Sequence, residues 1–126
     1  MKKFINNVDD FLKESLNGFG KAHSDIIKVN FEPNFVSRKT KTKEGKVSLI
    51  SGGGSGHEPM HGGFVGHGML DAACPGFVFS APTPDQMQAA AEHVDSGAGV
   101  PVSYTHLRAH ETLMNLVCRL LLEKKK

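Results

Sequence analysis

The sequence predicts an α/β fold in which an incomplete sheet is flanked by helices. Three observations lead to this prediction: an amphipathic segment opens the chain, two strand-like segments each precede a helix-start signal, and another apolar run begins at Val100. Strands that alternate with helices are typical of a sheet with helices packed against it. A chain of 126 residues with 39% hydrophobic content suits one modest core.

The opening segment is predicted to be a helix, because its apolar residues recur with helical spacing from Val8 onward. Asn7 is the expected N-cap, and Gly18 or Gly20 the expected stop. The apolar face is expected to pack on the core rather than on a partner. Its members are Phe11, Leu12, Leu16 and Phe19.

The next part of the chain is predicted to contain two short strands, at residues 34–37 and 46–50, joined by an exposed lysine-rich loop at 38–45. The second strand leads into the glycine-rich run 51–57, which we expect to be a turn. Pro59 suits the first position of a short helix that would follow this turn.

Residues 77–80 form another strand candidate, and a strong helix start follows it. Thr83-Pro84-Asp85-Gln86 is a capping box with proline at the first helical position. Gly97 is expected to end this helix, and Val100 to begin another strand. The buried helix face is predicted to consist of Met87, Ala90, Ala91 and Val94.

Composition and charge exclude several classes of protein. The net charge of +2 comes from the last 25 residues, where five basic residues face two acidic ones, so the rest of the chain has no basic stripe and nucleic acid is not an expected partner. No apolar run approaches the ~20 residues of a membrane span, and no signal core follows the start, so we expect no membrane association and a cytoplasmic location. Cys74 and Cys118 have neither metal-type nor disulfide-type spacing.

The run from Ser51 to His57 carries almost no side-chain bulk, since four of its residues are glycines and two are serines. Such a backbone can bring its N–H groups close to a small, oxygen-rich ligand at the carboxyl end of a sheet. A dinucleotide fingerprint starting at Gly52 would require glycine at position 57, and no Gly-Lys-Ser/Thr ending exists for a P-loop. We therefore expect no nucleotide or other cofactor on this chain. A flexible linker is disfavoured by the flanking strand and by Pro59.

His57 is the candidate catalytic residue, because imidazole can hydrogen-bond a substrate oxygen or move a proton near neutral pH. Glu58 is positioned in sequence to orient it, while the alternative of a polar residue without a catalytic role stays open. His57-Glu58-Pro59-Met60-His61 also matches the zinc hydrolase pattern His-Glu-x-x-His. Pro59 and the surrounding glycines disfavour the helix that this pattern needs, so no metal site is expected.

Several segments together resemble one family, the substrate-binding subunit of dihydroxyacetone (glycerone) kinase. They are Lys21-Ala22-His23, Gly45-Lys46-Val47, the run from Ser51 to His61, Gly68-Met69-Leu70, Ala73-Cys74-Pro75-Gly76 and Pro82-Thr83-Pro84-Asp85. The resemblance covers about residues 1–100 and implies a truncated amino-terminal part of the dihydroxyacetone kinase substrate domain. It implies that Gly54, Ser55, Gly56 and His57 contact the triose, and that His57 assists phosphoryl transfer.

The resemblance implies that the intact protein phosphorylates a hydroxyl of dihydroxyacetone, giving dihydroxyacetone phosphate in glycerol catabolism. The phosphoryl donor is expected on a partner, either ATP on a fused domain or ADP on a nucleotide-binding subunit recharged by the phosphotransferase system. A homodimeric parent is also implied. The family's covalent histidine and its lysine and Asn-Tyr-Thr-Gly-Asp segment after Val100 are absent. We therefore expect the fragment to be inactive by itself, and a non-catalytic ligand-binding or regulatory module is the alternative.

The likeness breaks at Val100. Back-translation of residues 102–112 and 116–124 reproduces parts of a common transposase sequencing adapter, separated by the length of an index barcode. We hypothesise that residues 1–100 are a partial substrate-binding domain and that residues 101–126 are a non-native, adapter-derived tail. Sequencing the source gene across codon 100 in an adapter-free library tests this hypothesis.

Overall fold

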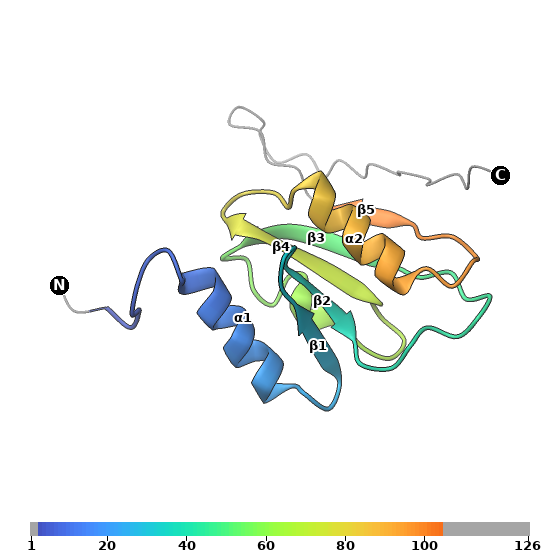
Figure 1. The fold of residues 1–126 in the computed structure, drawn as a ribbon, viewed down its shortest axis with the longest axis horizontal. Coiled ribbons are helices and arrows are strands. Elements are labelled where there is room, and N and C mark those ends of the chain that lie inside the picture. The colour runs from blue at the N-terminus through green and yellow to red at the C-terminus, as the bar shows by residue number, and fades with distance from the viewer. Residues whose placement is uncertain (1–2, 105–126) are drawn as a thin grey trace.

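The computed structural model describes residues 3–104, which form a five-stranded mixed sheet with a helix on each face (Figure 1). The elements are α1 (Phe11–Ala22), β1 (Ile27–Asn30), β2 (Phe35–Arg38), β3 (Ile50–Ser55), the 3-10 helix η1 (Gly62–Phe64), β4 (Ala72–Val78), α2 (Pro84–Val94) and β5 (Val102–Tyr104). The strand order is β1-β2-β4-β3-β5. β3 is parallel to β4 and to β5, whereas β1 and β2 extend the sheet in antiparallel fashion. The predicted α/β class is confirmed.

The two faces of the sheet carry separate cores, because neighbouring residues of a strand point to opposite faces. α2 covers the face that contains Phe35 and Ala72, while α1 covers the face that contains Val36 and Ala73. The α2 core includes Phe35, Ile50, Ala72, Cys74, Ala90, Ala91, Val94, Val100 and Val102. The α1 core is smaller and includes Leu16, Ile27, Val36, Val65 and Ala73.

The capping box of α2 is confirmed. The Thr83 hydroxyl accepts a hydrogen bond from the Gln86 N–H at 3.4 Å, and the Gln86 side chain accepts one from the Thr83 N–H at 2.9 Å. The Gln86 amide also donates to the carbonyls of Asn34 and Pro75, both at 2.9 Å, so the cap anchors the start of the helix to two sheet segments. The predicted buried face is confirmed for Ala90, Ala91 and Val94, with Met87 partly buried. The helix ends at Val94, ahead of the expected stop at Gly97.

The opening helix is confirmed, but its predicted ends are wrong. Asp10 is the N-cap residue, and Asn7 instead accepts a hydrogen bond from the Asp9 N–H at 3.3 Å. The helix continues through Gly18 and Gly20 to Ala22. At Gly20 a Cβ atom would lie 2.8 Å from Val29 Cγ2, so this glycine serves the close packing of α1 on β1 rather than a stop.

The strand positions needed larger corrections. β2 lies one residue beyond the predicted 34–37, and β1 was not predicted although Ile27-Lys28-Val29-Asn30 alternates as an edge strand should. The strand predicted at 46–50 begins only at Ile50 and runs through the glycines to Ser55, so the expected turn is largely a strand. Only Phe77 and Val78 of the strand predicted at 77–80 belong to β4, at its exposed end, and residues 79–80 form the following turn. Pro59 starts no helix.

The predicted strand near Val100 is confirmed as β5, which pairs with β3 from Ile50↔Val102 to Gly52↔Tyr104. Within residues 3–104 no helix has the length and apolar character needed to cross a bilayer. The proposed adapter-derived tail, residues 101–126, begins inside the sheet, since β5 falls within it. Its residues from position 105 onward lie outside the described residues, so the division at residue 100 stays a hypothesis.

A buried carboxylate fixes the start of the parallel pair. Asp71 has no exposed surface, and its carboxylate accepts hydrogen bonds from Arg38 Nη1 at 2.9 Å, from Lys46 Nζ at 2.6 and 2.8 Å, and from the Leu49 N–H at 2.9 Å. Burial by itself raises the pKa of Asp71, but these donors outweigh it, so the pKa of this carboxyl lies below its usual range. Three segments are joined by this one side chain.

Replacing Asp71 with Asn is expected to lower the free energy of unfolding by about 2–3 kcal/mol at pH 7. The largely buried Arg38 loses its anionic partner, whereas the loss at Lys46 is smaller because this side chain stays partly hydrated. The folded-state pKa is depressed, so the contribution of Asp71 is complete above its unfolded pKa and is lost as the pH falls below about 4. The gap between the two proteins in urea unfolding should therefore narrow on acidification. Asp25→Asn, at an exposed carboxylate, is the matched control. An equal loss of unfolding free energy in both variants would contradict the stabilising role of the Asp71 carboxylate.

Candidate functional site

The glycine-rich strand β3 allows two backbone segments to pack against each other without side chains between them. A Cβ atom at Gly52 would lie 2.8 Å from the Cys74 carbonyl oxygen, and one at Gly54 would lie 2.8 Å from the Ser80 nitrogen. On the facing strand, a Cβ at Gly76 would lie 2.1 Å from the Ser80 carbonyl oxygen. These glycines are required by close approach, and they let the turn after β4 fold over the end of β3.

Immediately after β3 the chain turns outward at Gly56, which has a φ of +105°. Its N–H donates to both oxygens of the Glu58 carboxylate, at 3.2 and 3.0 Å. The expected role of Glu58 in orienting His57 is therefore not what the structure shows. The Gly56 N–H instead holds an anionic oxygen of the chain itself, which identifies it as a donor available to oxygen ligands at this edge.

His57 is exposed at the top of this turn and meets the turn that follows β4. Its ring and that of Phe79 form an edge contact, with centroids 5.5 Å apart and planes at 82°. Phe79 has a positive φ of 52°, uncommon for a residue that is not glycine, and its N–H donates to the Ser55 carbonyl at 2.8 Å. The two turns at the carboxyl ends of β3 and β4 are thus tied together beneath the imidazole.

The four predicted contact residues lie consecutively at this edge but differ in what they expose. Gly54 and Ser55 are buried, and the Ser55 hydroxyl donates to the Gly76 carbonyl at 2.7 Å. Gly56 and His57 are exposed. The carboxyl end of the sheet is therefore lined by the Gly56 backbone and the His57 ring, while the side chain of Ser55 serves the sheet.

Phe79 is a site residue that the sequence analysis missed, since it was assigned to a strand. The contact between Phe79 and His57 joins positions that are distant in the chain, so local periodicity does not predict it. Phe77 and Val78, the last residues of β4, are also exposed, with exposed fractions of 68% and 48% beside 66% for Phe79. The Phe79 ring is the apolar group that contacts the imidazole.

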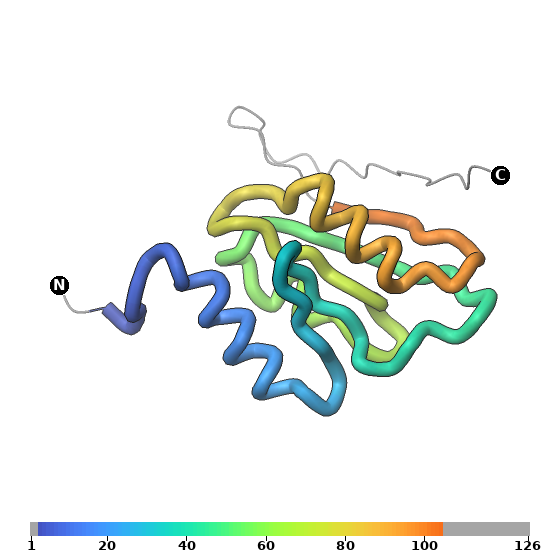
Figure 2. Tube along the Cα trace, in the orientation of Figure 1, coloured from blue at the N-terminus to red at the C-terminus, as the bar shows by residue number. Residues whose placement is uncertain are grey.

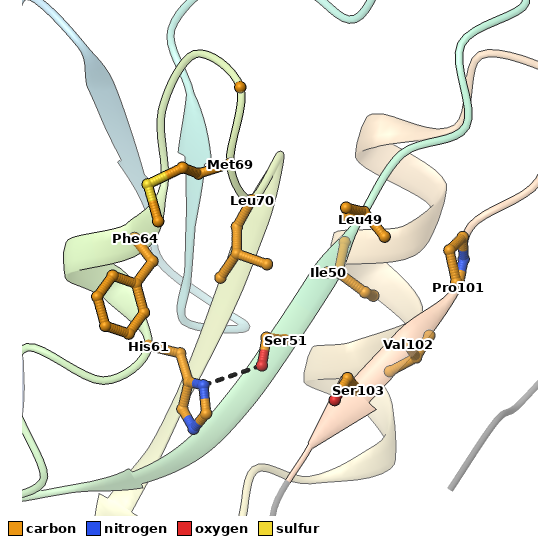
Figure 3. A pocket seen from close by; sticks show the side chains of 11 residues that line it. Leu49, Ile50, Ser51, His61, Phe64, Met69, Leu70, Pro101, Val102 and Ser103 are labelled. Carbon is orange, nitrogen blue, oxygen red and sulfur yellow. Dashed lines mark hydrogen bonds between the residues drawn. The ribbon is translucent and has the colours of Figure 1, made fainter. Parts of the chain in front are cut away.

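His61 lies on the same turn as His57 but has a different partner. Its Nδ1 is 2.9 Å from the Ser51 hydroxyl on β3, inside a mostly apolar cavity of about 510 Å³ (Figure 3). Burial lowers the pKa of His61, and the positive charge of protonated His57 lowers it further. His61 is therefore uncharged at neutral pH.

The remaining polar groups of the described residues give no support to the zinc hydrolase alternative, and Cys74 offers no reactive thiol. Across residues 3–104 no three His, Cys, Asp or Glu side chains gather as a metal site would require. The segment from His57 to His61 is a turn, not the helix on which His-Glu-x-x-His binds zinc. Cys74 is a free, buried thiol whose pKa is raised to about 12 by burial, so it is unreactive as a nucleophile; Cys118 lies outside the described residues.

Taken together, the fold and this edge define an α/β domain in which the Gly56 backbone and the His57 ring are exposed at the carboxyl ends of parallel strands. The trace in Figure 2 shows β3 and β4 side by side, with their following turns at the same edge. In open α/β sheets this edge is the usual ligand site.

Comparison with known proteins identifies the family. The family model described as the Dak1 domain matches residues 17–107. The dihydroxyacetone-binding subunit DhaK of the PEP-dependent dihydroxyacetone kinase of Escherichia coli is 52% identical over 100 residues, which cover 79% of this chain and 28% of that protein. The corresponding subunit of a PTS-dependent kinase of Listeria innocua is 46% identical, with 79% and 30% covered.

A solved structure agrees with this result. The crystal structure of the dihydroxyacetone kinase from C. freundii in complex with AMP-PNP and Mg2+ matches with a TM-score of 0.73 and 34% identity, covering 80% of this chain and 19% of that one. The chain belongs to the Dak1 domain family. It spans less than a third of the length of the curated relatives described above.

Gly54→Ala is expected to lower the free energy of unfolding by about 1–3 kcal/mol, because its Cβ would meet only backbone atoms, which no rotamer change can move. Gly18→Ala is the matched control. Its Cβ meets nothing within 4 Å on helix α1, so it should raise stability by about 1 kcal/mol. Urea unfolding measures both. A Gly54→Ala protein as stable as the parent would show that the close approach of β3 to Ser80 is absent.

Proposed function

We propose that this chain forms the triose-contacting part of a dihydroxyacetone kinase, which binds dihydroxyacetone and presents it for transfer of a phosphoryl group to its hydroxyl. The observation that carries the proposal is the exposed His57, held by its edge contact with Phe79 beside the Gly56 N–H at the end of β3. The dihydroxyacetone-binding relatives support the choice of ligand.

A small hydroxyketone suits the chemistry of this edge. The Gly56 N–H, which donates to the Glu58 carboxylate, becomes a donor for a carbonyl or hydroxyl oxygen of the ligand when Glu58 moves aside. His57 hydrogen-bonds the reacting hydroxyl. As that oxygen attacks phosphorus, the imidazole accepts its proton, and the bond from phosphorus to the donor oxygen breaks.

The phosphoryl donor and the partner belong to the same proposal. The chain carries no phosphate-binding nucleotide loop, so we propose that the donor is presented by a nucleotide-binding subunit or a fused domain, as ATP or as ADP recharged by the phosphotransferase system. His57 and its neighbour Phe79 are both exposed, so such a partner can approach the imidazole from solvent. A homodimeric parent is proposed on the resemblance to the family alone.

Titration of the chain with dihydroxyacetone, followed by the NMR signals of its imidazole groups, tests the ligand and the residue. The signals of His57 should shift, and those of His67, an exposed histidine of the following loop, should not. His57→Ala should weaken binding by at least about tenfold, as expected when a site loses a hydrogen-bonding side chain. His67→Ala is the control variant.

Glycerol, which lacks the carbonyl group, serves as the comparison ligand. Equal shifts with glycerol would argue against recognition of a hydroxyketone. If dihydroxyacetone leaves every imidazole signal unchanged, or if His57→Ala binds as tightly as the parent, His57 is not part of a triose site in this chain.

A further inference from the structure

His61 has no role in the proposed reaction, yet it is the most constrained histidine of the turn. Its Nδ1 meets the Ser51 hydroxyl at 2.9 Å, and Figure 3 shows the ring directed from the turn onto strand β3. Ser51 is only 6% exposed, so this hydrogen bond is shielded from water on the sheet side. A shielded hydrogen bond between a loop and a central strand fixes the loop in one position.

The same turn carries His57 through consecutive backbone hydrogen bonds. The Met60 N–H donates to the His57 carbonyl at 3.1 Å, and the Gly63 N–H donates to the Pro59 carbonyl at 2.9 Å. The Phe64 N–H then donates to the His61 carbonyl at 3.1 Å, which joins the turn to η1. These backbone hydrogen bonds couple the position of His61 to that of the His57 backbone.

His57 has little else that fixes it. It is exposed, and its ring makes an edge contact with Phe79, which is itself 66% exposed. On the amino-terminal side the chain leaves β3 through Gly56, whose φ of +105° is accessible to glycine but strained for other residues. A loop that begins on a glycine needs a second attachment if its histidine is to keep one orientation.

We infer that His61 is a positioning residue for His57, which acts by clamping the turn from Gly56 to His61 onto Ser51 of β3. This inference rests on the proposed function of His57. The clamp joins the turn to the same strand that delivers His57, so both attachments belong to one rigid element. Sites built on such elements hold their geometry more accurately than sites on free loops.

A nucleophilic role for the Ser51–His61 pair is disfavoured by its surroundings. A serine–histidine nucleophile needs an exposed hydroxyl and a third group that orients the imidazole. Ser51 is buried, and the nearest acidic side chain in sequence, Glu58, is bonded to the Gly56 N–H instead. The pair is suited to holding the turn.

The effect of a neutral His61 favours the same role. An uncharged imidazole bonds to a hydroxyl without placing a second positive charge beside His57. A lysine or arginine clamp at this position would repel a protonated His57 and would resist burial among Phe64, Leu70 and Val102.

Two variants of the clamp test the inference on the chain itself. Ser51→Ala removes the hydroxyl, and His61→Phe removes the nitrogen while filling the cavity; both should move the His57 imidazole signals away from the shift imposed by the Phe79 ring. They should also weaken dihydroxyacetone binding about tenfold, the loss that follows from one disordered hydrogen-bonding group. His61→Asn keeps a hydrogen-bonding atom near the Nδ1 position and should restore both readouts. His67→Phe is the matched control on the same loop.

The outcomes separate this inference from the proposed function. Absence of triose binding by the parent chain would overturn the proposed function, while the His57 signals in Ser51→Ala would still decide whether the turn is clamped. Normal binding and unchanged His57 signals in both Ser51→Ala and His61→Phe would overturn the inference while the proposed function stands. Thermal melting identifies a variant that has merely unfolded. In that case the decision rests on His61→Asn: if this variant does not restore the His57 signals and dihydroxyacetone binding, the inference is overturned.

Discussion

The structure depends on the close approach of strand β3 to β4 and to the turn after it. Gly52, Gly54 and Gly76 permit that approach, and each would place a Cβ atom within 2.9 Å of backbone if it carried one. Side chains between these segments would push the Phe79–Ser80 turn away from the end of β3. The Ser55–Phe79 backbone hydrogen bond and the His57–Phe79 ring contact both require the turn to stay close. The glycines therefore determine where the site forms, although they present no chemical group of their own.

The two ends of the β3–β4 pair differ in role: one end fixes the strand register, and the other carries the candidate site. At the beginning, Asp71 exchanges hydrogen bonds with Leu49, as its carboxylate accepts from the Leu49 N–H and its own N–H donates to the Leu49 carbonyl at 2.8 Å. This exchange sets the parallel register that starts at Ile50↔Ala72. At the far end the register shifts between Gly54 and Ser55, which turns the chain outward into Gly56. The buried Asp71 carboxylate and its hydrogen-bond donors fix the strands at one edge. At the opposite edge Gly56 and His57 are exposed.

The sequence predicted local features well and long-range ones poorly. The capping box at Thr83 was located correctly, because all the atoms that make it lie within one helical turn. The glycine-rich run was predicted as a turn because glycine is rare inside strands, but the backbone of a neighbouring strand, invisible to local patterns, makes glycine necessary at Gly52 and Gly54. His57 was found from its place after the glycines. Phe79 and the Ser51–His61 bond were missed because tertiary contacts alone create them.

The two histidines of the turn differ in burial, because His57 is exposed and His61 is partly buried. His57 is exposed to solvent, whereas burial lowers the pKa of His61 and the positive charge of a protonated His57 lowers the pKa of His61 further. Two imidazoles this close in one turn are not readily charged together, because each charge disfavours the other. Burial keeps His61 in its uncharged form. The hydrogen bond between His61 and Ser51 therefore holds the turn on β3 without placing a positive charge beside His57.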